Sequence, residues 1–160
     1  MSVSAWGGTL IRKLEGVAGC RQLKALVANN NLISNISALQ GLSRAAARLG
    51  GVGGAGRGEA QLECLILSHN CITEVPPECL GDLGALKKLS FSHNRLQHPP
   101  VVARCERLQE LRLAYNNITH VPLGCLPANL EILDLGHNQI HSLQVANRVQ
   151  ICMKIRENAY

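Results

Sequence analysis

Residues 108–118 read LQELRLAYNNI. Their frame is L-x-x-L-x-L-x-x-N-x-L, and it recurs at four other places in the chain, although Ala28 fills one apolar position weakly. The frames start at Leu23, Leu62, Leu86, Leu108 and Leu130, so successive starts lie 39, 24, 22 and 22 residues apart. Self-similarity at a nearly fixed period predicts a chain built of stacked repeats.

Each frame predicts a short strand followed by an inward turn. The alternating leucines place apolar side chains on one side of a strand. The asparagine ends this alternation, and its amide can both donate to and accept from backbone groups. Because neighbouring strands lie about 4.8 Å apart, we expect a ladder formed by Asn31, Asn70, Asn94, Asn116 and Asn138. Later apolar pairs predict short helices or 3₁₀ turns on the outer side: Leu39 and Leu42, Leu80 and Leu83, Val102 and Cys105, Leu123 and Leu126.

These repeats resemble the leucine-rich repeat family over about residues 10–143. The 22-residue period is similar to that of the intracellular subtypes. Residues 14–23 resemble the regulator-type repeats of protein phosphatase 1, and residues 75–83 resemble the Ras-suppressor type. The resemblance implies an α/β fold, a right-handed β-α solenoid. Such a solenoid has a curved parallel sheet on its concave face and short helices or 3₁₀ turns on its convex face.

The register divides the chain into three parts. Residues 1–22 are expected to form a degenerate amino-terminal capping repeat, because Trp6 and Thr9 do not fit the strand half of the frame. Residues 23–143 hold the five repeats, with a glycine-rich insertion at about 43–59. Residues 144–160 are expected to form a carboxy-terminal cap. Carrying the period forward puts Cys152 and Ile155 on a partial strand, and an amphipathic helix over about 144–156 is the alternative.

Composition limits the class of protein. Of the 160 residues, 46% are hydrophobic and 17% are charged, which is typical of a folded domain. No apolar run reaches the length of a membrane span or a signal peptide. Seven cysteines without a C-x-x-C pair indicate a reducing compartment. We therefore expect an intracellular protein of the cytoplasm or nucleus. Membership of a cytoskeletal or a ribonucleoprotein assembly is consistent with this location.

No pattern of residues indicates catalysis. Residues 51–56 match G-x-G-x-x-G, but no strand precedes them and no helix is expected after them, as a dinucleotide site requires. His69, His93 and His137 share one repeat position without a thiol or carboxylate beside them, so we expect no metal site. The sequence predicts no enzyme activity, no cofactor and no small-molecule substrate.

The side chains between the leucines are expected to form the concave face. Solenoids bind partners on such extended surfaces. We therefore predict a non-catalytic protein-interaction module, an adaptor or small subunit of a larger assembly. The candidate partner-binding residues are Lys88, Ser90, Glu110, Arg112, Asp134, Tyr115, His69, His93 and His137.

Charge suggests a second hypothesis. Residues 1–57 carry seven Lys and Arg against one Glu, a net charge of +6, whereas residues 58–160 carry nine against ten acids, a net charge of −1. A basic end favours an anionic partner. The alternative is thus a ribonucleoprotein component that contacts RNA, or an RNA-binding protein, through Arg12, Lys13, Arg21 and Lys24. The family resemblance alone suggests a third hypothesis, in which the protein is a regulatory subunit of a phosphatase or of a cytoskeletal motor.

Overall fold

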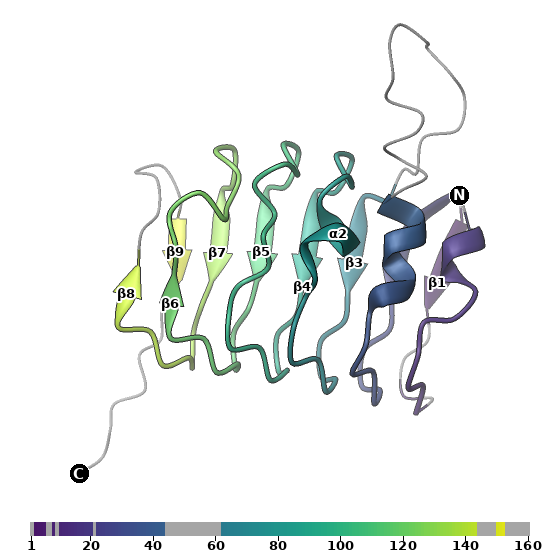
Figure 1. Ribbon diagram of the computed structural model, residues 1–160, viewed down its shortest axis with the longest axis horizontal. Coiled ribbons are helices and arrows are strands. Elements are labelled where there is room, and N and C mark those ends of the chain that lie inside the picture. The colour runs from purple at the N-terminus through teal and green to yellow at the C-terminus, as the bar shows by residue number, and fades with distance from the viewer. Residues whose placement is uncertain are drawn as a thin grey trace, which may run out of the picture.

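The protein is a solenoid with one long parallel sheet, as a computed structural model shows (Figure 1). The structure describes residues 2–5, 8, 10–20, 22–43, 62–143 and 150–152. Within them, the strands of the sheet follow one another in the order β1 (Ser2–Ala5), β2 (Leu23–Val27), β3 (Cys64–Ile66), β4 (Lys88–Ser90), β5 (Glu110–Arg112), β7 (Ile132–Asp134) and β9 (Gln150–Cys152). Because every neighbour is parallel, the chain must return along the outer side between strands. The α/β solenoid class that the repeats imply is confirmed.

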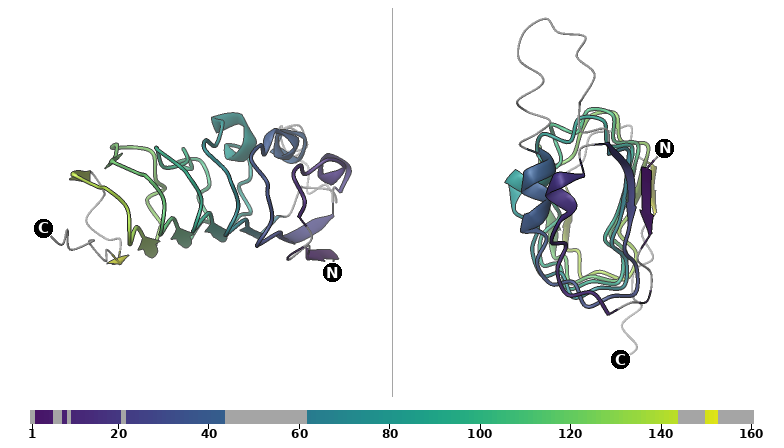
Figure 2. Two further views of the ribbon diagram at one scale, coloured as in Figure 1. Left: turned by 90° about the horizontal axis from the view of Figure 1, so that it is seen from below. Right: turned by 90° about the vertical axis from the view of Figure 1, so that its right-hand side faces the viewer.

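The strands pair in the register of the repeat. The fourth positions of the frames are Cα partners, so the series Leu26, Leu65, Leu89, Leu111 and Leu133 runs across the sheet. All five side chains are at most 1% exposed. Viewed along the solenoid, the chain forms an elongated ring with the sheet on one side and the short helices on the other (Figure 2). The leucines that point into this ring form a continuous core.

The outer side contains little helix. Its helical elements among the described residues are η1 (Val17–Gly19), η2 (Ser37–Leu39), residues 40–43 and α2 (Pro77–Leu80). A small second sheet pairs β6 (His120–Val121) with β8 (Ser142–Leu143). The short helices or 3₁₀ turns predicted at Val102 and Cys105 and at Leu123 and Leu126 are wrong, because both segments form turns or bends without helix. Leu123 is 75% exposed, and Cys125 is buried in its place because the turn passes through Gly124 at a φ of 80°.

The asparagine ladder forms as predicted, and each asparagine joins two turns. The Asn70 side chain accepts a hydrogen bond from Ile33 N at 3.0 Å and donates to Ala28 O at 2.9 Å, both in the preceding turn. Its Nδ2 also donates to Leu67 O of its own turn at 3.1 Å. The other four ladder asparagines likewise accept from the preceding turn: Asn31, Asn94, Asn116 and Asn138.

The two ends of the sheet extend beyond the five frames. At the amino end, β1 pairs with β2 and places Ser4 opposite Leu26, which is the register that a 22-residue period gives. At the carboxy end, β9 is a strand in which Ile151 pairs with Leu133. The partial strand therefore lies four residues earlier than the period predicts, because this turn is shorter. The rest of the proposed helix lies outside the described residues, as do residues 44–61 with nearly all of the glycine-rich insertion.

Gly41 lies where the helical residues 40–43 meet the preceding turn. A Cβ at this position would overlap the Cβ of Ala18. We expect Gly41→Ala to lower the free energy of unfolding by about 1–3 kcal/mol through overpacking, measured by urea denaturation. Ala18→Gly in the same background should recover most of the loss. Gly84→Ala is the control, because its Cβ would meet nothing within 4 Å. Equal losses at Gly41 and Gly84 would contradict this packing.

Candidate interaction surface

The outward side chains of β2, β3, β4, β5 and β7 form the surface of the sheet. Alternation along each strand produces this arrangement: Leu111 is fully buried, whereas Arg112 beside it is exposed. The surface has an apolar end at β2 and β3, where Ala25, Val27 and Ile66 are half-buried. Its central part, at β4 and β5, is charged.

The charged part is an ion-pair triad built on Glu110. Lys88 Nζ lies 3.3 Å from the Glu110 carboxylate on the neighbouring strand, and Arg112 Nε donates to the same carboxylate. Burial raises the pKa of Glu110, but hydrogen bonds from Arg112 and Lys88 outweigh it, so the net pKa is lowered. The side chains are 64%, 15% and 55% exposed for Lys88, Glu110 and Arg112. The triad therefore presents its two cations to solvent and covers its anion.

Two other predicted residues contribute less to this surface than the sequence suggests. Asp134 is the strand neighbour of Arg112, yet within the described residues it makes no ion pair with it. Its Oδ1 instead accepts a hydrogen bond from Gly136 N at 3.1 Å. Ser90 is only 9% exposed, because its hydroxyl bonds the hydroxyl of Ser68 at 2.8 Å.

Beside the sheet, four aromatic rings form one continuous stack. The ring centroids of His69 and His93 are 4.0 Å apart, those of His93 and Tyr115 are 4.1 Å apart, and those of Tyr115 and His137 are 4.0 Å apart. The planes of neighbouring rings differ by only 11–13°. We call these four side chains the ring stack. The sequence placed these residues at one repeat position, and the structure brings all four together.

The backbone explains why the rings align. Each ring-stack residue has a positive φ of 55–57°, and Asn30 and Gly8 continue this column in the earlier turns. Residues other than glycine and asparagine adopt this conformation at a cost of roughly 1 kcal/mol, and ring stacking offsets part of it. The same backbone angles in each turn aim the rings in one direction.

The ring stack perturbs the titration of its second member. Burial lowers the pKa of His93, and the neighbouring imidazoles of His69 and His137 lower it further. Because the rings are nearly parallel, the nitrogen lone pairs of the histidines lie in separate, nearly parallel planes. No group of three or more metal-ligating side chains occurs in the described parts of the chain.

Among the described residues, burial raises the thiol pKa of four cysteines, whereas Cys20 is exposed: the four are Cys64, Cys79, Cys105 and Cys125. Burial raises the pKa of Cys64 on the sheet surface, although Lys88 opposes it. Burial raises the pKa of Cys105 in the core to about 11. Since the thiolate is the nucleophile, both side chains stay protonated and unreactive near neutral pH.

Sequence reasoning missed a polar row at the start of the strands. These residues follow the first leucine of each frame: Lys24, Glu63, Lys87, Gln109 and Glu131. Lys87 Nζ donates to Glu63 Oε2 at 2.7 Å, and this bond lowers the pKa of Glu63. These residues share one repeat position, and this shared position is the signal by which the sequence could have revealed the row.

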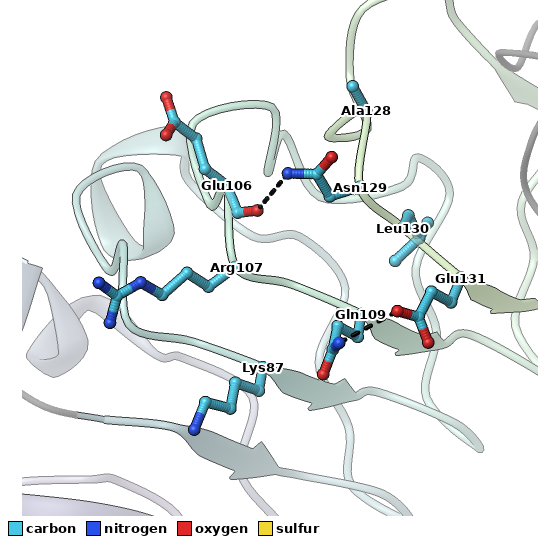
Figure 3. Close-up of a pocket in the computed structure, with 8 residues that line it drawn as sticks. All are labelled: Lys87, Glu106, Arg107, Gln109, Ala128, Asn129, Leu130 and Glu131. Carbon is cyan, nitrogen blue, oxygen red and sulfur yellow. Dashed lines mark hydrogen bonds between the residues drawn. The ribbon is translucent and has the colours of Figure 1, made fainter.

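A hollow of about 590 Å³ lies at the end of this row (Figure 3). Within it Gln109 Nε2 donates to Glu131 Oε1 at 3.0 Å, and Asn129 Nδ2 donates to Glu106 O at 3.1 Å. The Lys87 and Arg107 side chains both extend to the left in this view, with their charged ends apart (Figure 3). The two cations therefore do not converge on one site.

Two of the four basic residues of the RNA hypothesis lie beside acidic side chains. Lys13 lies 3.2 Å from Glu15, and Lys24 lies 4.0 Å from Glu63. Arg12 is exposed, and Arg21 lies outside the described residues. In the described ranges no helix is long and apolar enough to cross a membrane.

Comparisons with known proteins agree with this geometry. Three family models, each described as a leucine-rich repeat, match residues 54–98, 107–128 and 127–142. No curated protein matches the sequence. Among solved structures, the leucine-rich repeat domain of APL1B is 20% identical with a TM-score of 0.70, over 96% of this chain and 49% of that one.

Two bacterial proteins are similar as well. The leucine-rich repeat protein LIC12759 of Leptospira interrogans is 29% identical with a TM-score of 0.60, over 78% of this chain and 28% of that one. YopM from Yersinia enterocolitica is 22% identical with a TM-score of 0.56, over 84% and 24%. The chain thus spans half or less of each of these three structures. The repeat frame, the asparagine ladder and the three family models together show that the chain belongs to the leucine-rich repeat family.

Proposed function

We propose that this protein is a non-catalytic adaptor or small subunit of a larger intracellular assembly, and that it binds a partner protein through its concave face. Leucine-rich repeat domains are commonly protein-interaction modules, and they are typically non-catalytic. The observation that carries the proposal is the surface of β4 and β5, where Lys88 and Arg112 are more than half exposed above a covered Glu110. Exposed cations on a rigid sheet provide specific contacts to a partner.

Exchanging the charges of the triad tests this surface. The double variant Glu110→Arg with Arg112→Glu allows an ion pair between these two positions, but it exchanges their charges and places a cation beside Lys88. We expect capture of the partner from a cell extract to fall about tenfold, equivalent to about 1.4 kcal/mol. The measurement is affinity purification with quantitative mass spectrometry, beside thermal unfolding of both proteins.

The control exchanges a matched pair on the opposite side of the solenoid. Arg104 Nη2 lies 3.2 Å from Asp82, outside the concave face. The variant Arg104→Asp with Asp82→Arg should leave capture unchanged. Unaltered capture by the Glu110 and Arg112 variant would show that the partner binds elsewhere.

The RNA alternative has less support, because Lys13 and Lys24 lie beside acidic side chains. Nuclease treatment of the extract distinguishes the two. Capture of a protein partner should survive this treatment, and its loss would favour a ribonucleoprotein.

A further inference from the structure

The exposed charge of the concave face is positive, although acids and bases alternate along it. Lys88 and Arg112 are 64% and 55% exposed, whereas the Glu110 carboxylate between them is 15% exposed. Arg112 uses Nε for Glu110, and in the described part of the chain its terminal amino groups have no hydrogen-bond partner. Asp134 is half-buried and already accepts a bond from backbone. An approaching partner therefore meets cations first.

The ring stack adds hydrogen-bonding groups along the rim of this face. Its members use their ring faces for one another, so the edges carry the solvent contact. His69 and Tyr115 are exposed, and His93 and His137 are half-buried. Ring edges hold the imidazole nitrogens and the phenol hydroxyl. These groups recur about every 4 Å, at right angles to the strands.

Short side chains separate the cations from the ring stack. Ser92, Ala114 and Gly136 occupy the last outward position before the rings in three successive turns. An extended chain that crosses the strands there would have cations on one side and ring edges on the other.

We propose that the concave face binds an extended acidic segment of a partner protein, with carboxylates on Lys88 and Arg112 and polar backbone along the ring stack. The charge of the exposed groups selects an acidic segment over a basic one. The inference rests on the proposed function, since it names the partner chemistry for the same face.

The test uses the full chain and a short fluorescent peptide of alternating Glu and Ser, with fluorescence anisotropy as the readout. The peptide in which Gln replaces Glu should bind at least about tenfold more weakly. Lys88→Ala and Arg112→Ala should each weaken binding about tenfold, whereas Arg104→Ala should not change it. The double variant His69→Asn with His93→Asn should also weaken binding, since asparagine tolerates the positive φ but removes two members of the ring stack.

Equal binding of the Glu and Gln peptides would overturn the inference. So would tighter binding of single-stranded RNA than of the acidic peptide, or an equal loss in the Arg104→Ala control. Unchanged binding by the histidine double variant would remove the ring stack from the site. If no acidic peptide binds but the exchange at Glu110 and Arg112 still abolishes capture of the partner, the inference fails and the proposed function stands.

Discussion

Asn94→Ala should lower the free energy of unfolding by about 3 kcal/mol. The Asn94 side chain is 9% exposed and accepts a hydrogen bond from Ile72 N at 3.0 Å. Its Nδ2 donates to Leu67 O and to Phe91 O, each at 2.9 Å. Alanine leaves the Ile72 amide without a partner. The two carbonyls each lose one of two bonds, because ladder amides of neighbouring turns also donate to them.

Asn117→Ala is the matched control, measured by the same equilibrium denaturation. Asn117 directly follows a ladder asparagine but is exposed, and in the described residues its side chain makes no hydrogen bond. The expected change is within about 0.5 kcal/mol. If the two substitutions destabilised the protein equally, the ladder would not be the source of the effect.

Phe91→Ala should cost about 3–5 kcal/mol, the largest single effect expected in the core. Phe91 is fully buried at the sixth position of its frame. The other turns carry smaller side chains at this position: Ala28, Leu67, Leu113 and Leu135. Neighbouring turns are held in place by backbone bonds, such as Phe91 N to Arg112 O at 2.9 Å, so they cannot close around a cavity. The measurement is the urea midpoint with an unchanged slope.

Phe91→Leu separates loss of volume from loss of the aromatic ring. Leucine is the residue of the adjacent turns, so we expect a cost of about 1 kcal/mol. A cost as large as that of the alanine variant would mean that the ring makes a specific contact rather than filling space.

The sequence predicted the strands and the ladder because both depend on one repeated spacing. Because Leu89 and Leu111 both occupy the fourth position of their frames, parallel stacking fixes which residues face the core. The asparagines followed from the same register. Positions that depend on turn length were less predictable. Leu123 points outward because Gly124 redirects the chain, and β9 lies early because its turn is short.

The candidate surface was only partly predictable, because exposure there depends on side chains of neighbouring turns. Glu110 is covered by Lys88 and Arg112, and Ser90 is held by Ser68. Sequence alone gave these residues equal status. The shared position of the histidines indicated proximity, but the stacking of their rings required the backbone angles.

The asparagine ladder has a consequence for cooperativity. Because each amide bonds backbone of the turn before it, no turn completes its hydrogen bonding alone. Stability is then a sum of weak intrinsic terms and strong nearest-neighbour couplings, as in a one-dimensional Ising chain. A central turn has two such couplings and a terminal turn has one. Local unfolding therefore begins at the ends of the solenoid and moves inward. The charged centre of the sheet is the last part to unfold.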